Sequence, residues 1–173
     1  MPGPDFETVV ADYYEPLYRF AISLTHSEAD ACDLAQQTFY MWAKKGHQLR
    51  DFSKVKSWLF TTLYRIFLES RRSATRFPHS ELVEADSDLP VILPEAARQL
   101  DAHQAVAALG SVDEVYRAPV ALFYMEDCSY QEIAEILQVP LGTVKSRMAR
   151  GLAQLKHIFT AGDHARFQPR GQT

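Results

Sequence analysis

The sequence predicts an all-α protein in which two small helical domains are joined by an extended acidic linker. Apolar residues recur with a 3.6-residue period over most of the chain, and no stretch alternates as a strand would. Residues 73–94 contain three prolines, acids and serines and have no helical period, which is typical of a linker. We expect a first domain at 1–76, the linker at 77–94, a second domain at 95–160 and a loose polar tail at 161–173.

Three helices are expected in the first domain. Apolar residues at helical spacing predict one helix over residues 5–24. Ser27 is placed to cap a second helix, which ends at Gly46. A loop at residues 47–54 then leads to a third helix over residues 55–72.

The second domain is expected to begin with a helix over residues 95–109. Another helix starts after Val112 and meets Pro119, which either kinks that helix or opens a new turn. Both segments precede the most informative stretch of the chain.

The stretch from Ser129 to Leu155 predicts a helix-turn-helix. Ser129 and Glu132 have the spacing of a capping box, in which a hydroxyl and a carboxylate each satisfy a backbone amide at the start of a helix. This helix ends before Pro140, because the residue that precedes a proline avoids the α region. On the next helix, four apolar residues share one face: Val144, Met148, Leu152 and Leu155.

The second of these helices lies in a part of the chain that has no acid. Residues 139–157 contain four Lys or Arg and no Asp or Glu, which suits a helix laid in the major groove of DNA. A solvated amphipathic helix of an all-α core is the alternative interpretation. The residues expected to contact duplex DNA are Thr143, Lys145, Ser146, Arg147 and Arg150. Among them the two arginines can each make paired hydrogen bonds to a guanine.

The net charge of −4 is unevenly distributed along the chain. Residues 34–76 contain nine Lys or Arg and two acids, whereas residues 77–116 contain eight acids and one Arg. Residues 128–173 are basic again. Two basic blocks on either side of an acidic one indicate two nucleic-acid-facing modules and a linker with a different partner.

Other features narrow the class of protein. No apolar run approaches 18 residues and no signal or lipidation motif is present, so we expect a cytoplasmic protein without membrane insertion. Cys32 and Cys128 stand alone without other ligands at metal-binding spacing, so we expect packed thiols and neither a metal nor another cofactor. The common hydrolase, phosphate-loop and dinucleotide motifs are missing, which argues against an enzyme.

Residues 116–156, YRAPVALFYMEDCSYQEIAEILQVPLGTVKSRMARGLAQLK, resemble region 4 of bacterial sigma-70 family factors of the extracytoplasmic-function class. The resemblance implies that the helix-turn-helix reads the −35 element of promoters as double-stranded DNA. The motif alone is shared with many one-component regulators, so the N-terminal half has to distinguish the two classes.

Residues 30–45, DACDLAQQTFYMWAKK, resemble the helix with which this family docks on the clamp helices of RNA polymerase. Helical spacing places five residues on the face opposite Phe39 and Trp42: Asp30, Asp33, Gln36, Gln37 and Tyr40. Gln37 stands where the family usually has a glutamate. A merely solvated polar face is the alternative interpretation.

Residues 56–72, KSWLFTTLYRIFLESRR, resemble the family's helix that melts and reads the −10 element. Aromatic rings beside cations are what single-stranded DNA requires. The residues expected to contact the −10 strand are Arg50, Phe52, Lys54, Trp58, Tyr64, Arg65, Arg71 and Arg72. Arg65 and Glu69 stand where the family often has asparagine and aspartate, and Trp58 also suits a core position.

Taken together, the resemblance implies an alternative sigma factor that binds core RNA polymerase and directs promoter-specific initiation. It further implies control by an anti-sigma factor and a linker that threads a basic channel of the polymerase. The alternative is a one-component helix-turn-helix regulator that acts without polymerase docking. That class requires a ligand or phosphate-accepting pocket in residues 1–95, where no such motif is seen.

Overall fold

The computed structural model describes residues 3–74 and 102–166, and all regular structure in these two ranges is helical, as expected. The first module contains three long helices joined by short connections. These are α1 (Phe6–Thr25), α2 (Glu28–Lys45) and α3 (Val55–Ala74), with the 3₁₀ turns η1 (Gly46–Gln48) and η2 (Phe52–Lys54) between the last two. The linker at 77–94 lies outside the described residues, although α3 includes the first two residues of the proline- and acid-rich stretch.

The second module contains four helices. They are α5 (Ala102–Leu109), α6 (Glu114–Met125), α7 (Tyr130–Leu137) and α8 (Leu141–Arg166). The helix expected over 95–109 is described only from Ala102 onward, and Pro119 lies inside a continuous α6. The loose tail expected at 161–173 is wrong for residues 161–166, because α8 continues through them.

Side-chain caps fix where the long helices begin. Asp5 accepts a hydrogen bond from the backbone N–H of Thr8 at 2.7 Å, and Ser27 caps α2 in the same way through Asp30. Helix α2 ends at Gly46 as expected, but this glycine does not have the left-handed conformation of a typical helix end. Its φ of −57° is ordinary, but an added Cβ would lie 2.6 Å from the Trp42 ring, so close packing requires the glycine.

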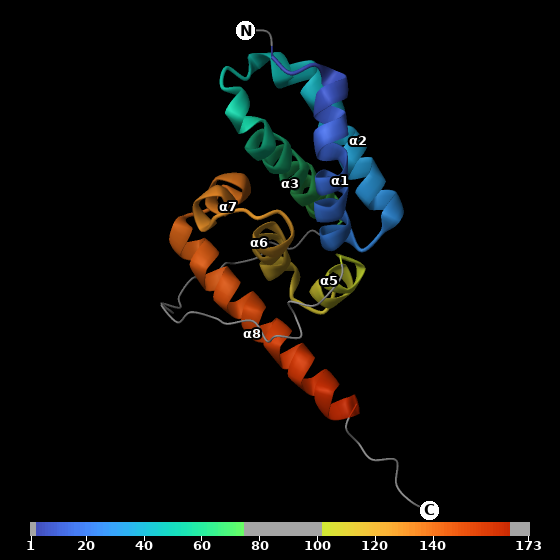
Figure 1. The fold of residues 1–173 in the computed structure, drawn as a ribbon, viewed down its shortest axis with the longest axis vertical. Helices are drawn as coiled ribbons and strands as arrows, with labels where there is room; N and C mark the ends of the chain where they lie inside the picture. The colour runs from blue at the N-terminus through green and yellow to red at the C-terminus, as the bar shows by residue number, and fades with distance from the viewer. Residues whose placement is uncertain (1–2, 75–101, 167–173) are drawn as a thin grey trace, which may run out of the picture.

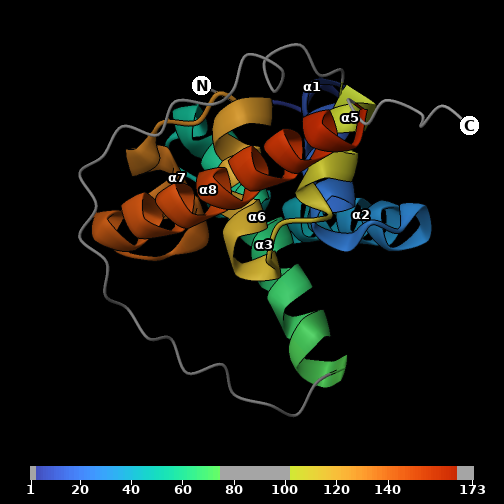
Figure 2. The same cartoon turned by 90° about the horizontal axis from the view of Figure 1, so that it is seen from below.

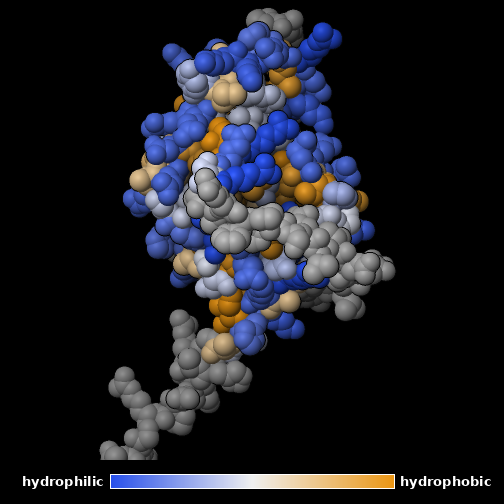
Figure 3. Space-filling model, turned by 180° about the vertical axis from the view of Figure 1, so that it is seen from behind, coloured by the Kyte–Doolittle hydropathy of each residue, from blue (hydrophilic) through white to orange (hydrophobic). Residues whose placement is uncertain are grey.

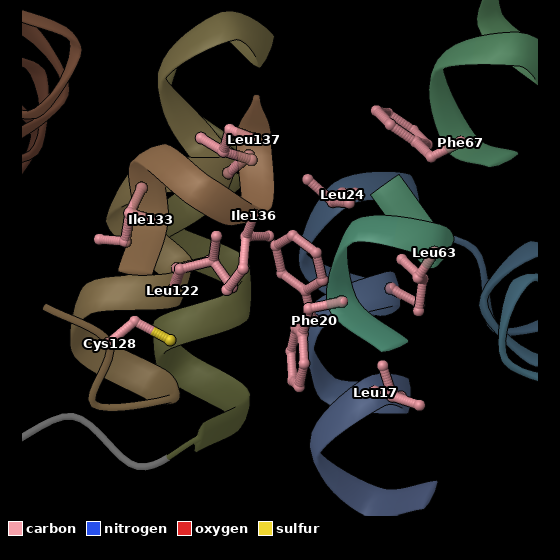
Figure 4. Packing of buried hydrophobic residues seen from close by; sticks show 14 of the residues in the cluster. Leu17, Phe20, Leu24, Leu63, Phe67, Leu122, Cys128, Ile133, Ile136 and Leu137 are labelled. Atoms are coloured by element: carbon pink, nitrogen blue, oxygen red, sulfur yellow. The ribbon is translucent and has the colours of Figure 1, made fainter. Parts of the chain in front are cut away.

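The two modules pack against each other, so their apolar residues form one continuous core. Helix α1 contacts α6, and α3 contacts α7. In Figure 4, Leu122 and Ile136 of the second module lie on one side of Phe20 of α1, and Leu63 of α3 lies on the other side. Full burial of each such side chain stabilises the fold by roughly 1.5–3 kcal/mol. The contact between the modules is therefore a substantial part of the core.

The helices of the first module lie side by side, and α8 extends beyond the rest of the molecule (Figure 1). In the view from below, the C-terminal end of α3 also projects from the body (Figure 2). Seen from behind, the surface is mainly hydrophilic, with apolar patches between the polar side chains (Figure 3). Among the described residues, no helix is long and apolar enough to cross a membrane.

Helices α6 and α8 pack closely at Gly151. A Cβ added there would meet Val120 Cγ2 at 2.7 Å and Tyr116 Cβ at 3.2 Å. Val120 is buried and cannot move aside. Glycine in a helix interior costs about 1 kcal/mol relative to alanine, so the close crossing explains why this residue suits the position.

We expect Gly151→Ala to lower the free energy of unfolding by about 1–3 kcal/mol, because overpacking outweighs the gain in helix propensity. Gly142→Ala is the matched control, since nothing lies within 4 Å of an added Cβ there. That variant should be neutral or more stable by up to about 1 kcal/mol. Urea denaturation of both variants measures the difference, and equal stabilities would contradict the close crossing.

Candidate nucleic-acid and polymerase interfaces

The first helix of the helix-turn-helix, α7, is fixed by a complete capping box. The Ser129 hydroxyl accepts from the backbone N–H of Glu132 at 3.2 Å, and the Glu132 carboxylate accepts from the backbone N–H of Ser129 at 2.7 Å. These bonds hold the pKa of Glu132 below its ordinary value. The helix ends at Gln138, which adopts left-handed φ and ψ of 57° and 45°, two residues before Pro140. The helix therefore ends just before Pro140, as expected.

The residues of α8 that are expected to contact DNA differ in their exposure to solvent. Lys145 and Arg150 are exposed, and Arg150 Nη1 donates to the Tyr116 hydroxyl at 3.4 Å. Ser146 is half-buried and donates to the Thr143 carbonyl at 3.1 Å.

Two members of that set do not face outward. Thr143 and Arg147 are each only 8% exposed, so the expectation that Arg147 lies on an open face is wrong for this arrangement. The reason is helical geometry. Arg147 follows Val144 by three residues and precedes Gly151 by four, and both of those residues are buried.

The residues expected to bind the −10 strand lie on η2, on α3 and in the loop before them. Arg50, Phe52 and Arg72 are exposed, and the Phe52 ring packs on Gly3 near the N-terminus. Trp58 is half-buried and makes an edge contact with Trp42 at 5.3 Å between ring centroids. Tyr64 stacks on Phe67 at 6.2 Å. Trp58 therefore packs against the core, which was one of the two roles expected for it from the sequence.

Three cations of the same set contact the second module. Lys54 Nζ lies 3.6 Å from a carboxylate oxygen of Glu135, and Arg65 Nη2 donates to the Gln138 side chain at 3.4 Å. The Arg71 guanidinium forms paired hydrogen bonds with the Glu114 carboxylate, one of them 2.9 Å long. All of these pairs lie at the surface.

The expected polymerase-docking residues share one exposed face of α2. The five are Asp30, Asp33, Gln36, Gln37 and Tyr40, and all are exposed. Lys44 lies 4.6 Å from the centroid of the Tyr40 ring, a cation–π contact that orients the ring. Phe39 and Trp42 are buried on the opposite side, so the rotation of this helix agrees with its sequence pattern.

The sequence did not single out the polar residues that link the modules in their interior. Arg19 makes two hydrogen bonds to the Glu126 carboxylate, at 2.9 and 3.2 Å, and Lys56 Nζ donates to the Glu126 carbonyl at 2.8 Å. Glu126 is 6% exposed. Burial raises the pKa of its carboxyl, and the hydrogen bonds from Arg19 oppose that shift. Arg19 is the only Lys or Arg in residues 1–33, and this isolated positive charge was the signal in the sequence that could have identified it.

The two cysteines are free thiols, with Cys128 buried beside this link and Cys32 half-buried on α2. Burial raises the pKa of the Cys128 thiol. Within residues 3–74 and 102–166, no group of His, Cys, Asp and Glu side chains could hold a metal ion.

Comparison with known proteins agrees with the arrangement of the two modules. The family model "Sigma-70 region 2" matches residues 9–77, and the model "Sigma-70, region 4" matches residues 102–155. These ranges contain the expected −10 and docking helices and the helix-turn-helix, respectively.

Individual relatives match over nearly the whole chain. The ECF RNA polymerase sigma factor SigM of Bacillus subtilis is 30% identical over 87% of this chain and 92% of its own length. SigE of Mycolicibacterium smegmatis, also an ECF sigma factor, is 32% identical over 88% of this chain and 61% of its own length. Among solved structures, a similar one is the sigma factor RpoE of Bartonella quintana in complex with the anti-sigma factor NepR. Its sequence is 26% identical, the TM-score is 0.70, and the match covers 90% of this chain and 97% of RpoE. With regions 2 and 4 in order on one chain, this protein belongs to the extracytoplasmic-function class of sigma-70 family sigma factors.

Proposed function

We propose that this sigma factor docks on core RNA polymerase through the exposed face of α2 and reads promoters with two separate surfaces. The loop before α3 and α3 itself take the −10 element as a single strand, and the N-terminal part of α8 takes the −35 element as duplex. The observation that carries the proposal is the combination, on one chain, of an exposed polar face on α2 with a capped helix-turn-helix whose second helix exposes Lys145 and Arg150. A one-component regulator would have no use for a polymerase-docking face on α2.

The −10 surface combines phosphate-binding and base-stacking groups. Arg50 and Phe52 precede α3, and Tyr64 and Arg65 follow on the helix. An exposed ring such as that of Phe52 can stack on an unpaired base, and the cations can follow the backbone. Because Trp58 packs against Trp42, we assign it to the support of this surface more than to strand contact.

The partners of the relatives support two further parts of the proposal. RpoE of Bartonella quintana is held by the anti-sigma factor NepR, and we propose control of the present chain by an anti-sigma protein as well. We place its action in the cytoplasm, where polymerase and chromosome are.

Run-off transcription tests the function directly. The purified chain, mixed with core RNA polymerase and genomic fragments, should give discrete transcripts that are missing when either protein is omitted. A chain that binds duplex DNA but neither captures core polymerase nor yields such transcripts would instead be a one-component regulator.

The docking face is tested by the double change Asp33→Arg and Gln36→Arg. Both residues are exposed, so helicity should stay the same while affinity for core polymerase falls at least about tenfold. Asp12→Arg, an exposed acid of α1, serves as the control and should bind as the wild type does. Unchanged affinity of the double variant in a pull-down titration would show that this face is only solvated.

Three single changes on α8 separate reading from packing. Arg150→Ala should lose about 1–3 kcal/mol of base discrimination at one upstream position, measured on a randomised −35 library. Lys145→Ala should weaken binding evenly across sequences and lower the salt slope by about 1. Arg147→Ala should mainly lower the free energy of unfolding, because this side chain is 8% exposed. Wild-type base preference in the Arg150 variant would contradict the assignment of α8.

A further inference from the structure

The Phe52 ring, which the proposed function assigns to base stacking, touches a backbone segment from a distant part of the sequence. A Cβ added at Gly3 would lie 2.6 Å from both Cε1 and Cζ of this ring. Carbon atoms that are not bonded pack at about 3.5–4.0 Å, so a side chain at position 3 would displace the ring. Figure 1 shows the chain before α1 passing beside the connection between α2 and α3. Residue 3 therefore limits where the Phe52 ring can lie.

The segment that carries Gly3 is fixed where it joins α1. Pro4 has a restricted φ, and it also restricts the backbone of the residue before it. Asp5 then caps α1 by accepting a hydrogen bond from the backbone N–H of Thr8 at 2.7 Å. This hydrogen bond lowers the pKa of the Asp5 carboxyl, so the charged cap is present at neutral pH. Gly3 thus belongs to a short segment that is tied to a helix end.

The loop that carries Phe52 is fixed as well. Asp51 Oδ1 accepts hydrogen bonds from the backbone N–H of Ser53 at 3.0 Å and from its hydroxyl at 2.7 Å. The backbone N–H of Lys54 donates to the Asp51 carbonyl at 3.0 Å, and Val55 is only 3% exposed. These contacts hold the backbone of the loop, whereas the Phe52 side chain projects from it and is 38% exposed.

Only the side-chain torsions of Phe52 then remain to decide the direction of its ring. Gly3 occupies one side of the ring, and the exposed part of the ring is left for a base. Fixing a side chain in its bound position before binding reduces the entropy that is lost on binding. The contact with Gly3 therefore prepares the ring for stacking.

We propose that Gly3 is a positioning residue of the −10 site, where its missing side chain allows the Phe52 ring to take the direction in which it stacks on an unpaired base. It deepens the proposed function and rests on it, because that function supplies the −10 surface. Gly3 acts through the ring and makes no base contact of its own. The −10 site is then built from the segment before α1 as well as from the loop and α3.

The substitution Gly3→Ala separates the position of the ring from the stability of the fold. Its methyl group would meet the far end of an exposed side chain, which can rotate away. The situation differs at Gly151, where the neighbouring Val120 is buried. Urea denaturation should therefore give Gly3→Ala the midpoint of the wild type, and a lower midpoint would overturn the claim that it acts through the ring alone.

Run-off transcription with core polymerase tests the effect on a promoter whose −10 element is randomised. Four proteins are compared: the wild type, Gly3→Ala, Phe52→Ala and the double variant. Loss of a stacking ring should lower promoter use about fivefold or more, and Gly3→Ala should change the relative use of bases at one −10 position about threefold or more. In the double variant, Gly3→Ala should add nothing, because the ring that it displaces is gone.

Two results of this comparison would overturn the proposal. One is a wild-type base preference in Gly3→Ala. The other is a change in preference that persists when Phe52 is alanine, since residue 3 would then act by another route.

Nuclear magnetic resonance tests the contact without polymerase and without a variant of Gly3. Selective isotope labelling of glycine gives amide signals for the seven glycines of the chain. Removal of the ring current in Phe52→Ala should shift the Gly3 signal, whereas the signal of Gly151, which is enclosed by α6, should stay in place. A stationary Gly3 signal would overturn the proposal.

These measurements distinguish the proposal from the function on which it rests. Promoter-specific transcripts from the wild type, together with an unchanged base preference in Gly3→Ala, would reject the positioning role alone. Unchanged use of the −10 library by Phe52→Ala would reject both this role and the place of Phe52 in the −10 surface. A lack of transcripts from the wild type would reject the proposed function itself.

Discussion

The burial of apolar side chains between the two modules is the contact on which the other features of this structure depend. Phe20 and Leu63 on one side, and Leu122 and Ile136 on the other, belong to a single core. Without that contact, each module would have a small core of its own, and small cores are only marginally stable. The ion pairs at the surface contribute little to this association, but they decide which cations remain available to a ligand.

The same contact bears on how tightly the two proposed DNA-reading surfaces could bind DNA in the free chain. Affinity for nucleic acid depends largely on the number of phosphates that are neutralised. Lys54 and Arg71 already have carboxylate partners, and Arg147 is largely buried. Fewer cations are then free to act together. Polymerase docking through α2 would supply the affinity that these surfaces lack, which suits a factor that works only as part of a holoenzyme.

Sequence reasoning was most successful where the signal is local. The capping box of Ser129 and Glu132, the helical stripe of Val144 and Met148 and the polar face of α2 all lie where spacing placed them. Local rules failed where the answer depends on a neighbouring element. Position 46 requires a glycine because the Trp42 ring lies against it, and the end of α8 could not be located from a polar composition alone. The link between Arg19 and Glu126 joins residues 107 positions apart, and no periodicity within one helix reveals such a pair.

The length of α8 has a mechanical consequence. It is one continuous helix of 26 residues, roughly 39 Å long, and it crosses α6 nearly backbone to backbone at Gly151. The half of the helix that carries Val144, Met148 and Leu152 is packed into the core, so the rod is anchored at that end, while its other end extends beyond the body. A force on the extended end therefore acts through a long lever on the packing of α8 against α6 and α7.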